Sequence, residues 1–118
     1  MTESDAAYTE LPSGLKYREI EAGDGSAKPT KNSLVTVHYE GELEDGEVFD
    51  SSIERGEPAS FPLSGVIAGW TEGVQLMSPG ARFQFLIPHH LAYGEDGFGD
   101  VIPPLETLKF EIELISIG

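Results

Sequence analysis

The stretch GVIAGWTEGVQLM, residues 65–77, decides how the fold of this chain is interpreted, because it contains the only tryptophan, Trp70. Its apolar residues recur at spacings near three and four, the stripe of an amphipathic helix, and they are Val66, Ile67, Trp70, Val74 and Met77. Ser64 is a candidate N-cap, and Ser78-Pro79-Gly80 stops the segment. We therefore predict a short helix whose apolar face centres on Trp70.

The flanks of this helix alternate between apolar and polar residues and favour strands. The expected strands cover residues 15–21, 34–43, 48–50, 59–63, 81–87 and 108–114. In the first strand Leu15, Tyr17 and Ile20 are expected to point inward, and Asp45-Gly46 marks a hairpin turn. The pattern predicts an α+β fold in which a curved antiparallel sheet of five to six strands wraps on one short helix.

Two segments between the strands do not alternate. Residues 51–57 are polar and indicate a bulge or an excursion before the chain returns to the sheet. Residues 88–104 are rich in glycine and proline, and we expect them to form a long loop without secondary structure. A loop of this length in a small domain is usually functional.

The length of 118 residues and the hydrophobic content of 39% fit one domain with a modest core. We expect residues 1–13 to be a polar lead-in and residues 14–118 to form the domain. The start of the chain lacks the basic and apolar regions of a signal peptide, and no apolar run approaches the ~20 residues of a membrane span. The chain has no cysteine, which fits a reducing compartment, so a cytoplasmic location is expected.

The charge and the histidines exclude several function classes. With 21 acidic and 7 basic residues the net charge is −14, which argues against nucleic acids and anionic membranes as partners. The acidity otherwise serves solubility. His38, His89 and His90 match no common metal spacing, and no nucleophile motif of the G-x-S-x-G type is present. We therefore expect no metal, no cofactor and no covalent catalysis.

An unusual number of aromatic residues remains, close to flexible loops. They are Tyr39, Phe49, Phe61, Trp70, Tyr93, Phe98 and Phe110. Each of them alone would fit an ordinary core. Together they could line a concave apolar pocket of the kind that binds small ligands, and a proline ring is a natural occupant of such a pocket.

Four sequence blocks resemble one family. The first is V-H-Y-x-G-x-L-x-x-G-x-x-F-D-S-S at residues 37–52, and the second is V-I-x-G-W-x-E-G at 66–73. The third is I-P-x-x-L-A-Y-G at 87–94, and the fourth is I-P-P-x-x-T-L-x-F at 102–110. In this order and spacing they resemble the tacrolimus-binding, FKBP-type peptidyl-prolyl cis-trans isomerases, from about residue 14 to residue 118. Residues 56–61 resemble the bacterial branch.

The resemblance implies a pocket floored by Trp70, in which the Ile67 N–H and the Tyr93 hydroxyl bond carbonyls flanking a substrate proline. It assigns catalysis to Asp50, Tyr93, Phe49 and Ile67. It assigns substrate binding to Tyr39, Phe61, Val66, Trp70, Phe98, Val101, Ile102 and Phe110. For Asp50 two roles stay open: orienting Tyr39 or an arginine such as Arg55, or bonding backbone N–H groups.

The expected function is therefore rotation of X–Pro bonds in peptides and proteins, assisting protein folding, with tacrolimus-type or rapamycin-type macrolides as inhibitors. A monomer is expected. Ala59 and Phe98 depart from many members of the family and bear on macrolide affinity and on the residue preferred before proline. A non-catalytic binding module for proline segments is the alternative, whereas a holdase chaperone is disfavoured because no large exposed apolar stretch is evident.

Overall fold

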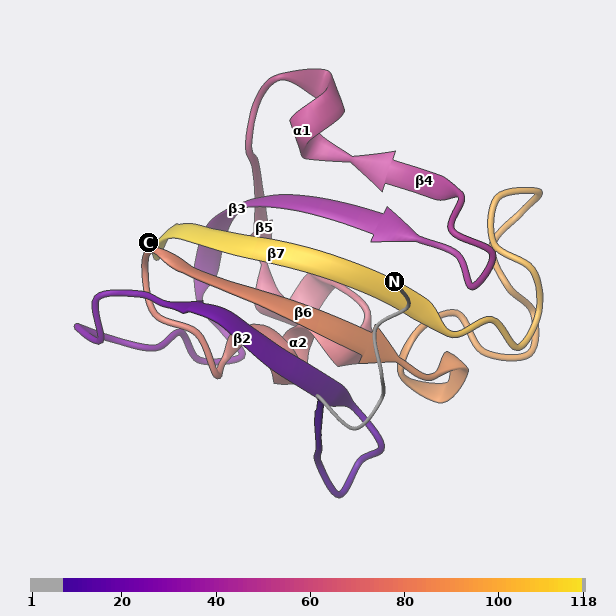
Figure 1. Ribbon diagram of the computed structural model, residues 1–118, viewed down its shortest axis with the longest axis horizontal. Helices are drawn as coiled ribbons and strands as arrows, with labels where there is room; N and C mark the ends of the chain where they lie inside the picture. The colour runs from indigo at the N-terminus through magenta and orange to yellow at the C-terminus, as the bar shows by residue number, and fades with distance from the viewer. Residues whose placement is uncertain (1–7, 118) are drawn as a thin grey trace.

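An antiparallel sheet of seven strands forms the body of the protein in the computed structural model, which describes residues 8–117 (Figure 1). The strands are β1 (Thr9–Glu10), β2 (Lys16–Ala22), β3 (Leu34–Glu42), β4 (Val48–Ser51), β5 (Ala59–Pro62), β6 (Ala81–Ile87) and β7 (Leu108–Ile117). Their order in the sheet is β1-β2-β6-β7-β3-β4, and β5 also pairs with β3. The long strands β3, β6 and β7 therefore lie at its centre.

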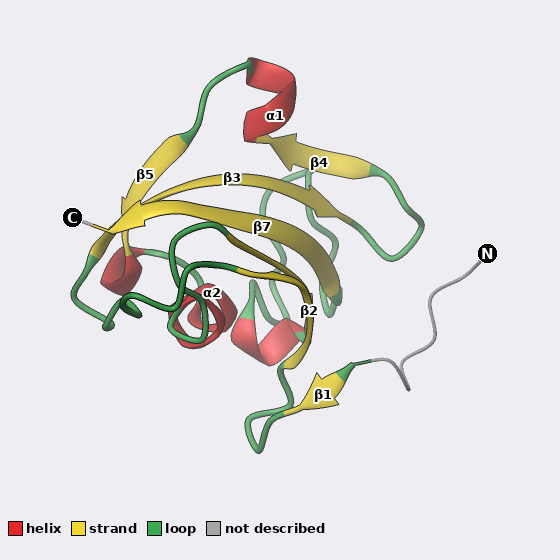
Figure 2. Cartoon of the chain, turned by 60° about the vertical axis from the view of Figure 1, so that its left-hand side comes forward, coloured by secondary structure: helices red, strands yellow, loops and turns green. Residues whose placement is uncertain are grey.

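Short helices connect the strands. They are α1 (Ser52–Arg55), the 3-10 turn η2 (Leu63–Gly65), α2 (Ala68–Val74) and the 3-10 turn η3 (His89–Leu91). Figure 2 shows α2 beneath the sheet, on the other side of β7 from α1, which follows directly on β4 at the edge. All helices of the described residues are too short or too polar to span a membrane.

Alternating burial along the central strands explains why the sheet has one apolar face. In β3, Val35 and Val37 are fully buried, whereas Thr36 between them and His38 after them are partly exposed. The helix α2 packs closely on this face because two of its residues are glycines. A Cβ on Gly69 would lie 2.5 Å from a side-chain carbon of Ile87, and one on Gly73 would lie 2.6 Å from Phe85.

The predicted fold class is confirmed, and the predicted central strands agree with those of the structure to within a few residues. The sheet has seven strands rather than five to six, because the two-residue strand β1 lies within the segment expected to be a polar lead-in. Residues 1–7 of that segment lie outside the described part of the chain. The excursion predicted for residues 51–57 contains the one-turn helix α1.

Two local predictions were wrong. Ser64 is not the N-cap of α2, because it lies in η2 and the helix begins only after Ile67, which caps it without a side-chain hydrogen bond. Ile20 was expected inward but is 43% exposed. The pairing of β2 with β6 shifts register between Glu19 and Glu21, and such a bulge turns the extra residue out of the regular alternation.

Candidate functional site

A cavity of about 430 Å³ opens between the sheet and the start of α2. Its lining residues are Tyr39, Phe49, Asp50, Phe61, Gly65, Val66, Ile67, Trp70, Tyr93 and Phe110. A second hollow of about 540 Å³ lies elsewhere, and Lys16, Glu42, Glu44 and Lys109 are among its lining residues. The second hollow is larger but strongly charged, so the aromatic cavity is the better site for an apolar group.

Trp70 forms the floor of the aromatic cavity through edge-to-face contacts with three rings. Its ring centroid lies 5.1 Å from that of Tyr39, 5.7 Å from that of Phe61 and 5.3 Å from that of Phe110, with interplanar angles between 82° and 90°. These are favourable geometries for aromatic pairs. The indole nitrogen Nε1 of Trp70 is buried and has no hydrogen-bond partner among the described residues.

The wall formed by Phe49 and Phe110 depends on a glycine. The register of β3 with β7 sets Gly41 opposite Phe110, and the rings of Phe49 and Phe110 meet edge to face at 5.6 Å. A Cβ on Gly41 would lie 2.6 Å from a ring carbon of Phe110 and 2.7 Å from one of Phe49. The two rings therefore occupy the space that any side chain at position 41 would need.

Asp50, Tyr39 and Arg55 form a closed hydrogen-bonded triangle at the edge of the cavity. The Tyr39 hydroxyl donates to Asp50 Oδ2 at 2.7 Å, and Arg55 Nη1 donates to Asp50 Oδ1 at 2.6 Å. Arg55 Nη2 donates to the Tyr39 hydroxyl at 3.0 Å. Of the two roles left open for Asp50, the contacts agree with orientation of both Tyr39 and Arg55. Burial and the hydrogen bond to Asp50 raise the pKa of Tyr39, so its hydroxyl stays protonated at neutral pH.

The helix α1 brings Arg55 back to Asp50. Ser51 caps its start by accepting a hydrogen bond from the Glu54 N–H at 3.2 Å, and Gly56 ends it in the left-handed conformation. Ser52 anchors the turn: its buried hydroxyl accepts from the Tyr39 N–H at 2.8 Å. One turn of helix thus places the guanidinium within hydrogen-bond distance of the carboxylate.

Two donors at the cavity have no partner among residues 8–117. The Ile67 N–H lies just before α2, and no acceptor of the described residues takes its hydrogen. The Tyr93 hydroxyl likewise makes no hydrogen bond there, although its residue lines the cavity. Burial, followed by the negative charge of Asp50, raises the pKa of Tyr93 and keeps this hydroxyl a donor. Both donors are available to a bound ligand.

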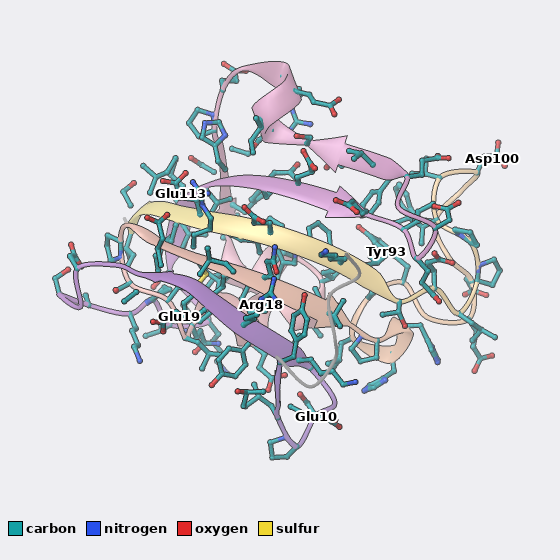
Figure 3. All side chains as sticks on the ribbon, in the orientation of Figure 1. Glu10, Arg18, Glu19, Tyr93, Asp100 and Glu113 are labelled. Carbon is teal, nitrogen blue, oxygen red and sulfur yellow. The ribbon has the colours of Figure 1, made fainter. Side chains whose placement is uncertain are left out.

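The loop after η3 contributes less to the cavity than predicted. Figure 3 shows Tyr93 and Asp100 at the same end of the molecule, the end at which this loop projects. The rings of Tyr93 and Phe98 lie 5.2 Å apart, but Phe98 is 58% exposed. Val101 is 47% exposed, whereas Ile102 is buried and accepts a hydrogen bond from the Phe98 N–H at 2.8 Å. Phe98, Val101 and Ile102 do not line the cavity.

The other nine predicted site residues all line it: Tyr39, Phe49, Asp50, Phe61, Val66, Ile67, Trp70, Tyr93 and Phe110. Gly65 lines the cavity without having been predicted, and a glycine before an apolar helix gives no signal of such a position. The short helix that places Arg55 had a signal, because Ser51 and Glu54 have the S-x-x-E spacing of a helix start. Among residues 8–117, no group of three or more His, Asp and Glu side chains could hold a metal ion.

Comparison with known proteins decides the family. Residues 25–115 match the model of the FKBP-type peptidyl-prolyl cis-trans isomerases. The chain belongs to this family. The FKBP-type domain is 54% identical over 105 residues to the FKBP-type 22 kDa peptidyl-prolyl cis-trans isomerase of Escherichia coli strain K12. That match covers 89% of this chain and 50% of the relative, so the chain spans about half the length of that curated relative.

Solved structures of FKBP-type proteins agree with this fold. A peptidyl-prolyl cis-trans isomerase from Pseudomonas syringae superposes with a TM-score of 0.88 at 43% identity, covering 95% of this chain and 81% of the other. FkpA from Escherichia coli superposes with a TM-score of 0.89 at 45% identity, covering 94% of this chain and 51% of the other. The FKBP-type domain described here thus corresponds to part of a longer protein in FkpA.

Proposed function

We propose that this FKBP-type domain accelerates cis–trans rotation of X–Pro bonds in peptides and proteins, and that the aromatic cavity holds the proline ring. The observation that carries the proposal is the pair of donors, the Ile67 N–H and the Tyr93 hydroxyl, that have no partner within residues 8–117 and lie at a cavity floored by Trp70. A prolyl residue in a chain presents an apolar ring between two amide carbonyls. The ring complements the aromatic rings of the cavity, and the carbonyls complement the two donors.

The chemistry needs no covalent step. Rotation about the X–Pro bond crosses a barrier of roughly 18–20 kcal/mol because it breaks amide resonance. The twisted amide is less charge-separated than the planar one, so an apolar cavity favours the transition state over the solvated ground state. Ring faces fix the proline while the preceding carbonyl turns, and the interactions become stronger in the transition state than in the planar amide. A barrier lower by ~5 kcal/mol gives several thousand-fold acceleration.

The triangle of Asp50, Tyr39 and Arg55 keeps one wall of the cavity in place during this rotation. Its three hydrogen bonds lie between 2.6 and 3.0 Å and connect β3, β4 and α1. Because the Tyr39 hydroxyl is bonded to the carboxylate, its ring is held against Trp70. In this proposal Asp50 acts on the substrate indirectly, through the position of the cavity wall and the electrostatic field there.

The substrates in this proposal are proline-containing polypeptides. Tacrolimus-type and rapamycin-type macrolides are proposed to compete for the same cavity, as the family resemblance implies. The monomeric state and the cytoplasmic location predicted from the sequence belong to the same proposal. Sedimentation velocity tests the first, and fractionation of the native cells tests the second.

The experiment that tests the function is a peptide exchange assay with and without tacrolimus. Magnetization-exchange NMR on a short X–Pro peptide should show faster cis–trans exchange with catalytic amounts of the protein, and tacrolimus should abolish the increase. The fluorescence of Trp70 should change with the same midpoint in tacrolimus concentration, because the macrolide covers the indole. Tacrolimus binding without faster exchange would instead support a binding module.

A further inference from the structure

A shallow groove runs beside the aromatic cavity, along α2. Its volume is about 530 Å³, and its lining residues are Lys31, Val66, Ala68, Thr71, Glu72 and Gln75. Val66 lines both the groove and the cavity, so the two hollows adjoin. A polypeptide whose proline occupies the cavity can therefore continue into the groove without leaving the protein surface.

The polar side chains that α2 and the residue after it place in this groove already have partners within the protein. Thr71 Oγ1 donates to the Leu63 carbonyl at 2.6 Å, and Gln75 Nε2 donates to the Thr71 carbonyl at 2.8 Å. Glu72 Oε1 accepts a hydrogen bond from the Ser13 hydroxyl at 2.6 Å. These hydrogen bonds occupy one polar atom of each side chain. The surface of the groove is mainly apolar, and Glu72 is the one acidic side chain among its lining residues.

Lys31 differs from them, because no ion pair or hydrogen bond engages its ammonium group within residues 8–117. The side chain is exposed and precedes β3, in a loop held against η2 by the hydrogen bond from the Leu63 N–H to the Ser33 carbonyl at 2.9 Å. The protein has only 7 basic residues against 21 acidic ones, yet no carboxylate of residues 8–117 forms an ion pair with Lys31. A cation beside an apolar groove that adjoins the cavity is thus positioned for a charge supplied by the ligand.

We propose that this groove binds the segment of the substrate polypeptide that flanks the proline, with apolar residues over Val66 and Ala68 and an acidic residue paired with Lys31. The inference rests on the proposed function and names the sequence class of its substrates. The net charge of −14 repels acidic peptides at long range, but salt screens such repulsion beyond about 8 Å. The local ion pair then determines the preference.

The test compares a short X–Pro peptide with eight-residue peptides that extend it by apolar residues ending in Glu, Gln or Lys, on either flank. On one flank, the Gln extension should lower KM relative to the short peptide. On that flank the Glu peptide should exceed the Lys peptide in kcat/KM by roughly two- to fivefold, the range expected of an exposed ion pair. Lys31→Ala should remove this preference, whereas Lys28→Ala, on the same loop but outside the groove, should keep it.

The outcomes separate this inference from the function itself. A short peptide that is not turned over at all would contradict the proposed isomerase activity. Normal turnover of the short peptide, together with equal kcat/KM for all extended peptides, would overturn the proposal about the groove and leave the proposed isomerase activity standing. A preference for the Lys peptides, or a Glu preference that survives Lys31→Ala, would also overturn it. A preference that weakens as salt rises would support it.

Discussion

The Tyr39 hydroxyl and the Asp50 carboxylate lie 2.7 Å apart, and their hydrogen bond joins the wall of the aromatic cavity to the ion pair between Asp50 and Arg55. Both members of that ion pair are roughly half exposed, so it contributes little to stability. Its importance lies in geometry, because it fixes the carboxylate that in turn fixes the Tyr39 ring.

Replacing Asp50 should therefore affect activity more than stability. Asp50→Ala is expected to lower kcat/KM for an X–Pro peptide by about tenfold, or roughly 1.4 kcal/mol of transition-state stabilisation. The free energy of unfolding should fall by about 1 kcal/mol or less. Peptide exchange kinetics and urea titration measure the two quantities. Glu57→Ala, an exposed residue just beyond α1, serves as the control and should leave both unchanged; equal activity of the two variants would contradict the role given to Asp50.

The Tyr93 hydroxyl should matter only when a ligand is present, because it has no hydrogen-bond partner within residues 8–117. Tyr93→Phe is expected to reduce kcat/KM by several-fold, since one net hydrogen bond is worth about 0.5–1.5 kcal/mol. Thermal unfolding should show no loss of stability. The matched control is Tyr17→Phe, whose ring stacks on Phe83 away from the cavity and should leave the kinetics as they are. A destabilised Tyr93→Phe protein with unchanged kinetics would refute this assignment.

Gly41 should be intolerant of even a methyl group. Gly41→Ala places a carbon within 2.7 Å of the rings of Phe49 and Phe110, so one ring must move. Overpacking of this kind costs about 1–3 kcal/mol of unfolding free energy. The displaced ring should also reduce peptide exchange at temperatures at which near-UV circular dichroism shows the variant folded. If Gly41→Ala had the unfolding free energy of the wild type, the rings of Phe49 and Phe110 could move without loss of stability, and the prediction would be wrong.

The raised pKa values of Tyr39 and Tyr93 predict the response to alkaline pH. The folded state binds these phenolic protons more tightly than the unfolded state, whose tyrosines titrate near pH 10. Their contribution to stability is therefore complete below about pH 10 and is lost as pH rises through the folded pKa. Urea titrations from pH 8 to 11.5 should show this loss, and it should be smaller in Tyr39→Phe. Spectrophotometric titration that shows all four tyrosines ionising below pH 10 would contradict the prediction.

The sequence predicted the positions of the central strands and the place of Trp70 on the apolar face of the helix. Both predictions succeed because apolar residues recur with the period of the strand or helix that contains them. The sequence placed the start of the helix too early for the same reason: Val66 and Ile67 face the cavity, so the apolar stripe begins before the helical backbone does at Ala68. Periodicity reports which face is apolar and does not report where the hydrogen bonds of a helix begin.

The loop after η3 was harder to predict for a physical reason. Its path depends on glycines with positive φ, at Gly94, Gly97 and Gly99, and no periodic pattern fixes where such a loop directs its side chains. The exposure of Phe98 could therefore not be derived from the sequence. The triangle around Asp50 was predicted in part, as an orientation of Tyr39 or Arg55. The motif supplied the carboxylate, but the turn of helix that returns the arginine to it is marked only by the S-x-x-E spacing of Ser51 and Glu54.

The most direct test of the central claim is the rate of cis–trans exchange in a short X–Pro peptide, measured by NMR with wild-type protein and with Phe49→Ala. We predict that catalytic amounts of the wild type raise the exchange rate by orders of magnitude over that of the free peptide, and that Phe49→Ala, which opens the cavity wall, raises it far less. Equal exchange rates with and without the wild-type protein would contradict the account.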